Sequence, residues 1–243
     1  MLELKNINFT VNDENTGEEK EILKNINIKF ETGHFIVITG PNGGGKSTLA
    51  KIIMGLETPT SGQIIFNGED ITNLSINERA KLGIGFAFQQ PVRFKGLKVK
   101  DLLRLAAGKD ISTEKACEHL SKVGLCAQDY IDRELNESLS GGEMKRIEIA
   151  MLMARNIQLS LFDEPEAGID LWSFHNLIAI FKHLRDSTNG SLIIISHQER
   201  ILEIADEIVI IKDGEISEYG SKEEMLPKLL GNVDICNYYR KEA

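Results

Sequence analysis

The stretch FIVITGPNGGGKST, Phe35 to Thr48, decides the fold. Its first five residues predict a short buried strand. The residues that follow it have the spacing of one helix face: Leu49, Ile52, Ile53 and Leu56. Between the two, Gly40 to Ser47 matches the pattern G-x-x-x-x-G-K-[ST] at every required position. The sequence therefore predicts a strand, a phosphate-binding loop and a helix in direct succession.

Each residue type in this loop has a physical role in holding phosphate. Glycines let the backbone wrap closely around an anion, and the helix start adds a partial positive charge. Lys46 can reach the β- and γ-phosphates, and the Ser47 hydroxyl can bind Mg²⁺. A glycine-rich turn that binds nothing is disfavoured by the strand and helix on either side. The predicted phosphate-binding residues are Gly40, Pro41, Asn42, Gly43, Gly44, Gly45, Lys46, Ser47 and Thr48.

Strands and helices alternate along the rest of the chain, which predicts an α/β fold with a mostly parallel sheet. LELKNINFTV and ILKNINIKF read as an antiparallel hairpin, and turns at Asn67-Gly68 and Asp213-Gly214 predict two more. A helix stripe is expected at Leu171, Phe174, Leu177, Phe181 and Leu184. The chain is expected to form one domain, with residues 1–90 and 156–243 as the core and about 91–155 as an inserted helical part.

Composition excludes several classes of partner. The 243 residues carry a formal net charge of -9, so nucleic acid is not an expected partner. No stretch approaches the roughly 20 apolar residues of a membrane helix, and MLELKNINF lacks the pattern of a signal peptide. Three cysteines without a CxxC motif predict no disulfide framework. We therefore expect a cytoplasmic protein that reaches any membrane through a partner.

Three further segments place polar residues where strands end. In LSLFDE, Asp163 is expected to hold Mg²⁺ and Glu164 to polarise a water, although an acidic helix-capping pair is the alternative. His197, in IIISHQER, can donate to a γ-phosphate oxygen. Gln89, in FAFQQP, can meet the metal or the water. The predicted catalytic residues are Lys46, Glu164 and His197, and the predicted metal ligands are Ser47, Gln89 and Asp163.

A second helix start, LSGGE at Leu139 to Glu143, has no lysine of its own. Ser140 can cap the helix, and Gly141 and Gly142 expose backbone N–H groups. It lies in the helical part and not on the strand edge that carries Lys46. Either it is a plain helix cap, or it completes the phosphate site of a second copy of the chain.

The motifs GPNGGGKST, Gln89, LSGGE, LSLFDEPEAGID and SHQ occur in the order and spacing of ATP-binding-cassette (ABC) ATPases, which the whole chain resembles. The resemblance implies a RecA-like P-loop NTPase core, an antiparallel β subdomain and an inserted α-helical subdomain. It also implies two copies that sandwich ATP and Mg²⁺, with Ser140, Gly141, Gly142 and Glu143 closing the partner's site. Glu164 then matches the catalytic glutamate, His197 the switch histidine, and Gly168 and Asp170 the loop that links the two sites.

One departure concerns the base. The family often stacks an aromatic ring on adenine from the first hairpin, and the matching position here is Val11. Phe9 points to the same face of that strand but is expected in the core. Preference for ATP over GTP is therefore inferred from the family.

Three short sequence segments resemble the SufC-type ATPases of iron–sulfur cluster assembly: FAFQQPVRFKG, SGGEMKR with Glu143, and SHQERIL. That resemblance implies a SufB/SufD-like β-helical scaffold as the partner. Gln90, Pro165 and the Glu166-Ala167 pair instead resemble transporter cassettes, whose partner is a transmembrane subunit. In both cases the partner is expected to dock beside Gln89, at 91–100, with Arg93, Phe94, Lys95 and Leu97 as contacts. A stand-alone kinase is disfavoured because it needs no LSGGE.

Overall fold

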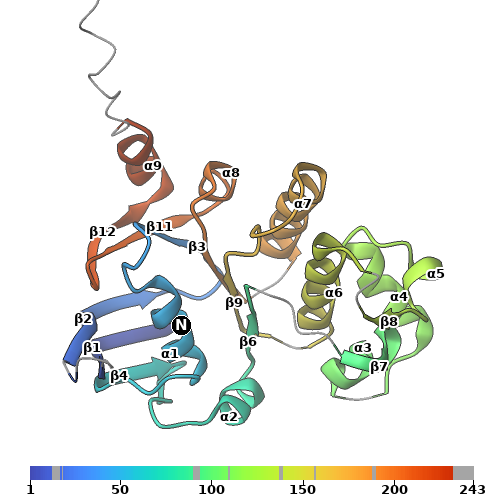
Figure 1. Cartoon of the computed structure of the whole chain (residues 1–243), viewed down its shortest axis with the longest axis horizontal. Coiled ribbons are helices and arrows are strands. Elements are labelled where there is room, and N and C mark those ends of the chain that lie inside the picture. The colour runs from blue at the N-terminus through green and yellow to red at the C-terminus, as the bar shows by residue number, and fades with distance from the viewer. Residues whose placement is uncertain are drawn as a thin grey trace, which may run out of the picture.

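The computed structural model describes residues 1–12, 17, 19–89, 94–108, 110–136, 139–155, 157–187 and 190–231. Figure 1 shows a central sheet with an antiparallel sheet beside it and a group of helices on the other side. This arrangement confirms the predicted α/β class with an antiparallel β subdomain and a helical insert. The domain bounds at 90/91 and 155/156 stay a prediction.

The central sheet has six strands in the order β12-β11-β3-β10-β9-β6. All neighbours are parallel except β11 and β12, which form the predicted hairpin at Asp213-Gly214. The strands are β3 (Phe35–Thr39), β6 (Ile84–Ala87), β9 (Leu159–Asp163), β10 (Ser191–Ile195), β11 (Glu207–Lys212) and β12 (Glu215–Ser221). Because β3, β9 and β10 are parallel, their carboxyl ends meet at one edge, where ligands bind in such sheets.

Helices cover the two faces of this sheet. Alternate residues of β3 point to opposite faces, so Phe35 and Val37 join one core cluster while Ile36 and Ile38 join the other. The first cluster holds apolar residues of α6 (Gly141–Ala154) and α7 (Leu171–Ser187). The second holds those of α1 (Lys46–Met54) and of the antiparallel sheet. The helix after the phosphate loop and the LSGGE helix therefore lie on opposite faces.

The antiparallel sheet has the order β2-β1-β4-β5. Its strands are β1 (Leu2–Asn12), β2 (Glu19–Phe30), β4 (Ser61–Phe66) and β5 (Glu69–Asp70). The β4–β5 turn is the predicted Asn67-Gly68, with both residues at positive φ, as a tight hairpin turn requires. Most of the acidic tip of the first hairpin, residues 13–16 and 18, lies outside the described residues.

The middle of the chain is mostly helical, as expected, and adds a short ladder. Its elements are β7 (Phe94–Lys98), α3 (Val99–Ala107), α4 (Thr113–Lys122), α5 (Ala127–Tyr130), β8 (Glu134–Leu135) and α6. β7 and β8 pair antiparallel, which the sequence did not suggest because each strand is very short. The remaining helices are α2 (Ile76–Lys81), α8 (Glu199–Leu202) and α9 (Lys222–Gly231).

Two residues of the predicted helix stripes are exposed, and those two predictions are wrong. Leu56 lies beyond α1, which ends at Met54 with Gly55 as its left-handed cap. Leu171 is 68% exposed because the first turn of α7 is fixed by Asp170 and not by apolar packing. Phe174, Leu177, Phe181 and Leu184 are buried as expected.

Arg79 is a fully buried cation that no sequence pattern singled out. Its guanidinium donates to the carbonyls of Ile52 and Ile53 at 2.6 and 2.7 Å, and to those of Leu74 and Thr72 at 3.0 and 2.8 Å. These partners compensate the cost of burying the charge. Arg79 thereby satisfies free carbonyls at the end of α1 and fixes the helix that follows the phosphate loop.

Candidate functional site

The loop of residues 40–45 runs between β3 and α1 at the carboxyl edge of the sheet. Gly40 has φ 132°, and a Cβ there would lie 2.0 Å from the Ile211 carbonyl oxygen. Gly45, the N-cap of α1, has φ 102°, and its Cβ would meet the Leu23 side chain at 2.6 Å. Only glycine fits these positions, which explains why the loop can pass so close to β11 and β2.

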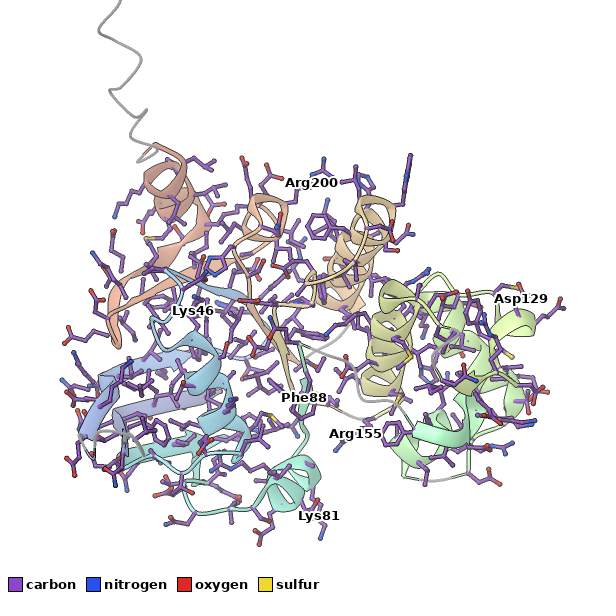
Figure 2. The ribbon with its side chains drawn as sticks, viewed as in Figure 1. Lys46, Lys81, Phe88, Asp129, Arg155 and Arg200 are labelled. Carbon is purple, nitrogen blue, oxygen red and sulfur yellow. The ribbon has the colours of Figure 1, made fainter. Side chains whose placement is uncertain are left out.

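Lys46 is the first residue of α1, and its ammonium is buried in this loop (Figure 2). Nζ donates to the carbonyl oxygens of Gly40 and Pro41 at 2.8 and 2.9 Å. Burial lowers the pKa of Lys46, while Glu164 and Asp163 oppose that shift. The loop thus curls around its own lysine, and an incoming phosphate has to compete with two carbonyls for this cation.

Asp163 ends β9 and is buried. Ser47 Oγ donates to Asp163 Oδ1 at 3.0 Å, so two of the three predicted metal ligands are in contact. Burial raises the pKa of Asp163, and the hydrogen bond from Ser47 opposes the shift. A buried carboxylate with one hydroxyl partner retains free oxygen lone pairs for a cation.

Glu164 and Gln89 are also in contact. Gln89 Nε2 donates to Glu164 Oε2 at 2.7 Å. Glu164 has φ 43°, a left-handed conformation that is uncommon for a non-glycine residue, and its N–H donates to the Ile195 carbonyl at 3.0 Å. Such strained positions concentrate at functional sites. The turn directs Glu164 away from β9 and towards Gln89.

His197 follows β10 and lies near Thr39, at the end of β3, with 3.5 Å between Nδ1 and the Thr39 hydroxyl. Burial and the charge of Lys46 lower the pKa of His197, while Glu164 raises it. The imidazole is therefore neutral at pH 7, with one N–H to donate. Thr39 follows directly from the strand that carries the loop, yet the sequence did not mark it.

Glu166 and Ser196 form a second pair that sequence reasoning missed. Ser196 Oγ donates to Glu166 Oε1 at 2.5 Å and accepts from the Gln198 N–H at 3.0 Å. Burial raises the pKa of Glu166, and its Oε2 has no hydrogen-bond partner among the described residues. Their only signal was position: Glu166 lies two residues after Glu164, and Ser196 directly precedes His197.

The LSGGE segment starts α6 as predicted. Ser140 and Glu143 form a reciprocal capping box, with Glu143 N donating to Ser140 Oγ and Ser140 N to Glu143 Oε2. Tyr130 also donates to Glu143 Oε1. Burial raises the pKa of Glu143, but hydrogen bonds from Tyr130 and Ser140 outweigh it and keep that pKa below its usual value. Ser140 and Gly141 remain exposed at the helix start.

Asp170 caps α7 next to this segment. Its carboxylate accepts from the N–H groups of Trp172 and Ser173 at 2.9 and 3.0 Å and from Ser173 Oγ at 2.7 Å. Gly142 packs so closely on Ser173 that a Cβ at Gly142 would lie 2.5 Å from Ser173 Oγ. The starts of α6 and α7 are therefore one packed unit.

The structure gathers the predicted site residues into two groups. Lys46, Ser47, Gln89, Asp163, Glu164 and His197 form the first group, at the carboxyl edge of the sheet. Ser140 to Glu143 and Asp170 form the second, on the α6 face. Val11 lies near the end of β1, opposite Lys20, and is 37% exposed. Phe9 is half-buried and packs against the core, as expected.

Such an arrangement defines an α/β nucleotide-binding ATPase, and comparison with known proteins assigns its family. Residues 23–167 match the family model described as "ABC transporter". The chain is 43% identical, over 92% of its length and 88% of the relative's, to an uncharacterized ABC transporter ATP-binding protein, MJ0035, of Methanocaldococcus jannaschii. It is 35% identical to the sulfate/thiosulfate import ATP-binding protein CysA of Synechocystis sp., over 91% of this chain and 64% of that one.

A solved structure agrees with these relatives. The ATP-binding cassette MJ0796, in a dimeric post-hydrolysis state with ADP and Pi, superposes with a TM-score of 0.81 at 27% identity. The match covers 91% of this chain and 99% of that one. The chain belongs to the ABC transporter family, and it is an ATPase of the ABC type that hydrolyses ATP. The roles of the individual site residues stay predictions.

The His197 imidazole provides a test of the site's electrostatics. In the nucleotide-free protein we expect it to titrate below its ordinary value of about 6.5. Lys46→Met removes a cause that lowers this pKa and should move the midpoint up, whereas Glu164→Gln should move it down. NMR titration measures both shifts, with the signal assigned by His197→Gln. His119, in the helical part, is the internal control and should not move; shifts of the opposite sign would contradict the geometry.

Proposed function

We propose that this chain is the motor subunit of a larger ABC assembly, in which two copies close head to tail around ATP and separate after hydrolysis. The observation that carries the proposal is the division of the site into two groups, one at the carboxyl edge of the central sheet and the other at the starts of α6 and α7. Lys46 and its loop offer a phosphate cradle, while the exposed start of α6 offers backbone N–H groups at a helix N-terminus. Two incomplete halves support a site that a second copy completes.

The residues around Lys46 suit ATP with Mg²⁺. Ser47 and Asp163 supply hard oxygen donors of the kind that Mg²⁺ prefers, with the remaining positions left to phosphate and water. When bound, Mg²⁺ neutralises charge on the phosphates.

Glu164 is proposed to polarise the attacking water and His197 to donate to the γ-phosphate. Gln89 already contacts Glu164 and can orient the same water or a metal-bound one. Val11 supplies an apolar side chain without a ring, so adenine stacking is expected to contribute little. Asp170 is proposed to communicate between the two sites because it fixes the α7 start against Gly142 through Ser173.

A groove beside Gln89 supports docking of a separate partner. It has a volume of about 590 Å³ and lies between β6, α2, α3 and α6. Phe88, Phe94 and Leu105 line it and are exposed apolar side chains, as at protein-binding sites. Of the predicted contacts, Phe94 lines this groove. Leu97 is half-buried and packs against the core, while residues 91–93 and the Lys95 side chain lie outside the described residues.

Two partners fit this groove. The names of the relatives favour a membrane transporter, whose transmembrane subunit would dock on the cytoplasmic side. The local sequence around Gln89, Glu143 and His197 favours the SufC-type alternative, in which the partner is a soluble SufB/SufD-like scaffold for iron–sulfur clusters. In the described parts of the chain no helix has the length and apolarity to span a bilayer.

ATP-dependent pairing tests the composite site. In a Glu164→Gln background, which should bind ATP but hydrolyse it at least 100-fold more slowly, analytical ultracentrifugation should detect a dimer only with ATP. Adding Ser140→Arg should keep the chain monomeric, because the large cation blocks the seam, while ATP affinity is unchanged. Ser112→Arg is the matched control, since Ser112 caps α4 in the same way away from the site. Dimers that persist with Ser140→Arg would rule the arrangement out.

Recovery of the chain from cell extract identifies the partner. The transporter proposal predicts co-purification with an integral membrane protein that requires detergent, and Leu105→Glu should abolish it by placing a charge in the groove. Leu230→Glu, at an exposed leucine of α9, is the control and should recover the partner as the parent does. Recovery of a soluble partner without detergent would instead support the SufC-type alternative.

A further inference from the structure

Two charged side chains of α6, the buried Lys145 and the half-buried Glu148, bind the main chain of Phe88. Lys145 Nζ donates to the Phe88 carbonyl oxygen, and Phe88 N donates to Glu148 Oε1 at 3.2 Å. Lys145 Nζ and Glu148 Oε2 lie 3.7 Å apart. β6 ends at Ala87, so these side chains take over the main-chain partners that a strand neighbour supplied before. We call this set of contacts the Phe88 clasp.

Burying the charges of the Phe88 clasp costs free energy, and packing of α6 alone does not require that cost. Lys145 is only 2% exposed, and burial lowers its pKa while the nearby Glu148, Asp163 and Glu166 oppose that shift. Burial raises the pKa of Glu148, whose Oε2 has no hydrogen-bond partner among the described residues. An apolar pair of the same size often stabilises a fold as well as a buried ion pair does. The pair therefore points to a requirement beyond stability.

That requirement is found one residue further along. Gln89 follows Phe88 directly, and its side chain donates to Glu164 Oε2 at 2.7 Å. A continuous series of bonds thus runs from α6 through the Phe88 main chain and Gln89 to Glu164. Phe88 and Glu148 also line the groove beside Gln89, so an occupant of the groove would contact the clasp itself.

We infer that Lys145 and Glu148 are positioning residues, which hold the Phe88 main chain so that Gln89 stays on Glu164. The position of α6, which begins with the LSGGE segment, then sets the hydrolysis rate of the same chain. The inference rests on the proposed role of Gln89. It assigns a purpose to two charges that no motif explained.

A double-mutant cycle tests this directly. Glu148→Ala and Gln89→Ala should each lower kcat by about 10- to 100-fold, since small misplacements at a reacting centre have effects of that order. ATP affinity should change by less than about twofold. If the clasp acts through Gln89, the double variant should have the kcat of Gln89→Ala alone, whereas independent structural damage would multiply the losses. Glu148→Gln keeps an acceptor oxygen for Phe88 N and should retain most of kcat.

A second variant separates positioning from folding. Lys145→Met with Glu148→Leu replaces the buried pair by apolar side chains and should keep the Tm of the parent while kcat falls as in Glu148→Ala. Glu118→Ala, at an exposed carboxylate of α4, is the control and should keep full turnover. Full turnover in the Met/Leu variant, or multiplied losses in the cycle, would overturn the clasp. Unchanged kcat in Gln89→Ala would overturn the role of Gln89 itself, and the clasp with it.

Discussion

The parallel register of β3, β9 and β10 is the constraint on which the site depends. Ile195 pairs with Ile38 on one side and with Asp163 on the other, so the three strands end at the same level. Glu164 and Ser196 directly follow that level, and the phosphate loop begins two residues after Ile38. A slip of one residue in one strand would turn every side chain of that strand to the opposite face, where it would meet the wrong packing partners. The register is therefore strongly specified. The chemistry is therefore fixed by the same packing that forms the core.

Polar groups at this edge form hydrogen bonds with one another, and a phosphate group could replace these bonds. Lys46 is held by two carbonyls of its own loop, Ser47 by Asp163, and Gln89 by Glu164. A phosphate group supplies stronger, charge-assisted partners to the same donors. Under the proposed function, ATP binding would replace existing hydrogen bonds of these donors and would not require new donors to be assembled. Within a single copy, the N–H groups at the exposed start of α6 would have no phosphate to bind.

Local signals in the sequence predicted most of the fold and of the site near Lys46. The phosphate loop, the Asn67-Gly68 and Asp213-Gly214 turns and the Ser140 cap depend on neighbouring residues, and each is as expected. Long-range contacts were missed: Arg79 on the end of α1, and Lys145 and Glu148 on Phe88. Charged residues in a helix usually face solvent, so only their packing in three dimensions reveals these roles. Leu171 was misplaced because helical spacing alone does not show where the apolar face of α7 begins.

The central claim is that each ATP is held by two chains, through Lys46 of one and Ser140 to Gly142 of the other. Mixing two variants tests it most directly, both in the Glu164→Gln background: Lys46→Ala, which lacks the cradle, and Ser140→Arg, which lacks the closing surface. We expect neither variant alone to dimerise when ATP is added. The mixture should form dimers that contain one chain of each variant and one bound ATP, measured by sedimentation. A mixture that stays monomeric, or pairing by either variant alone, would contradict it.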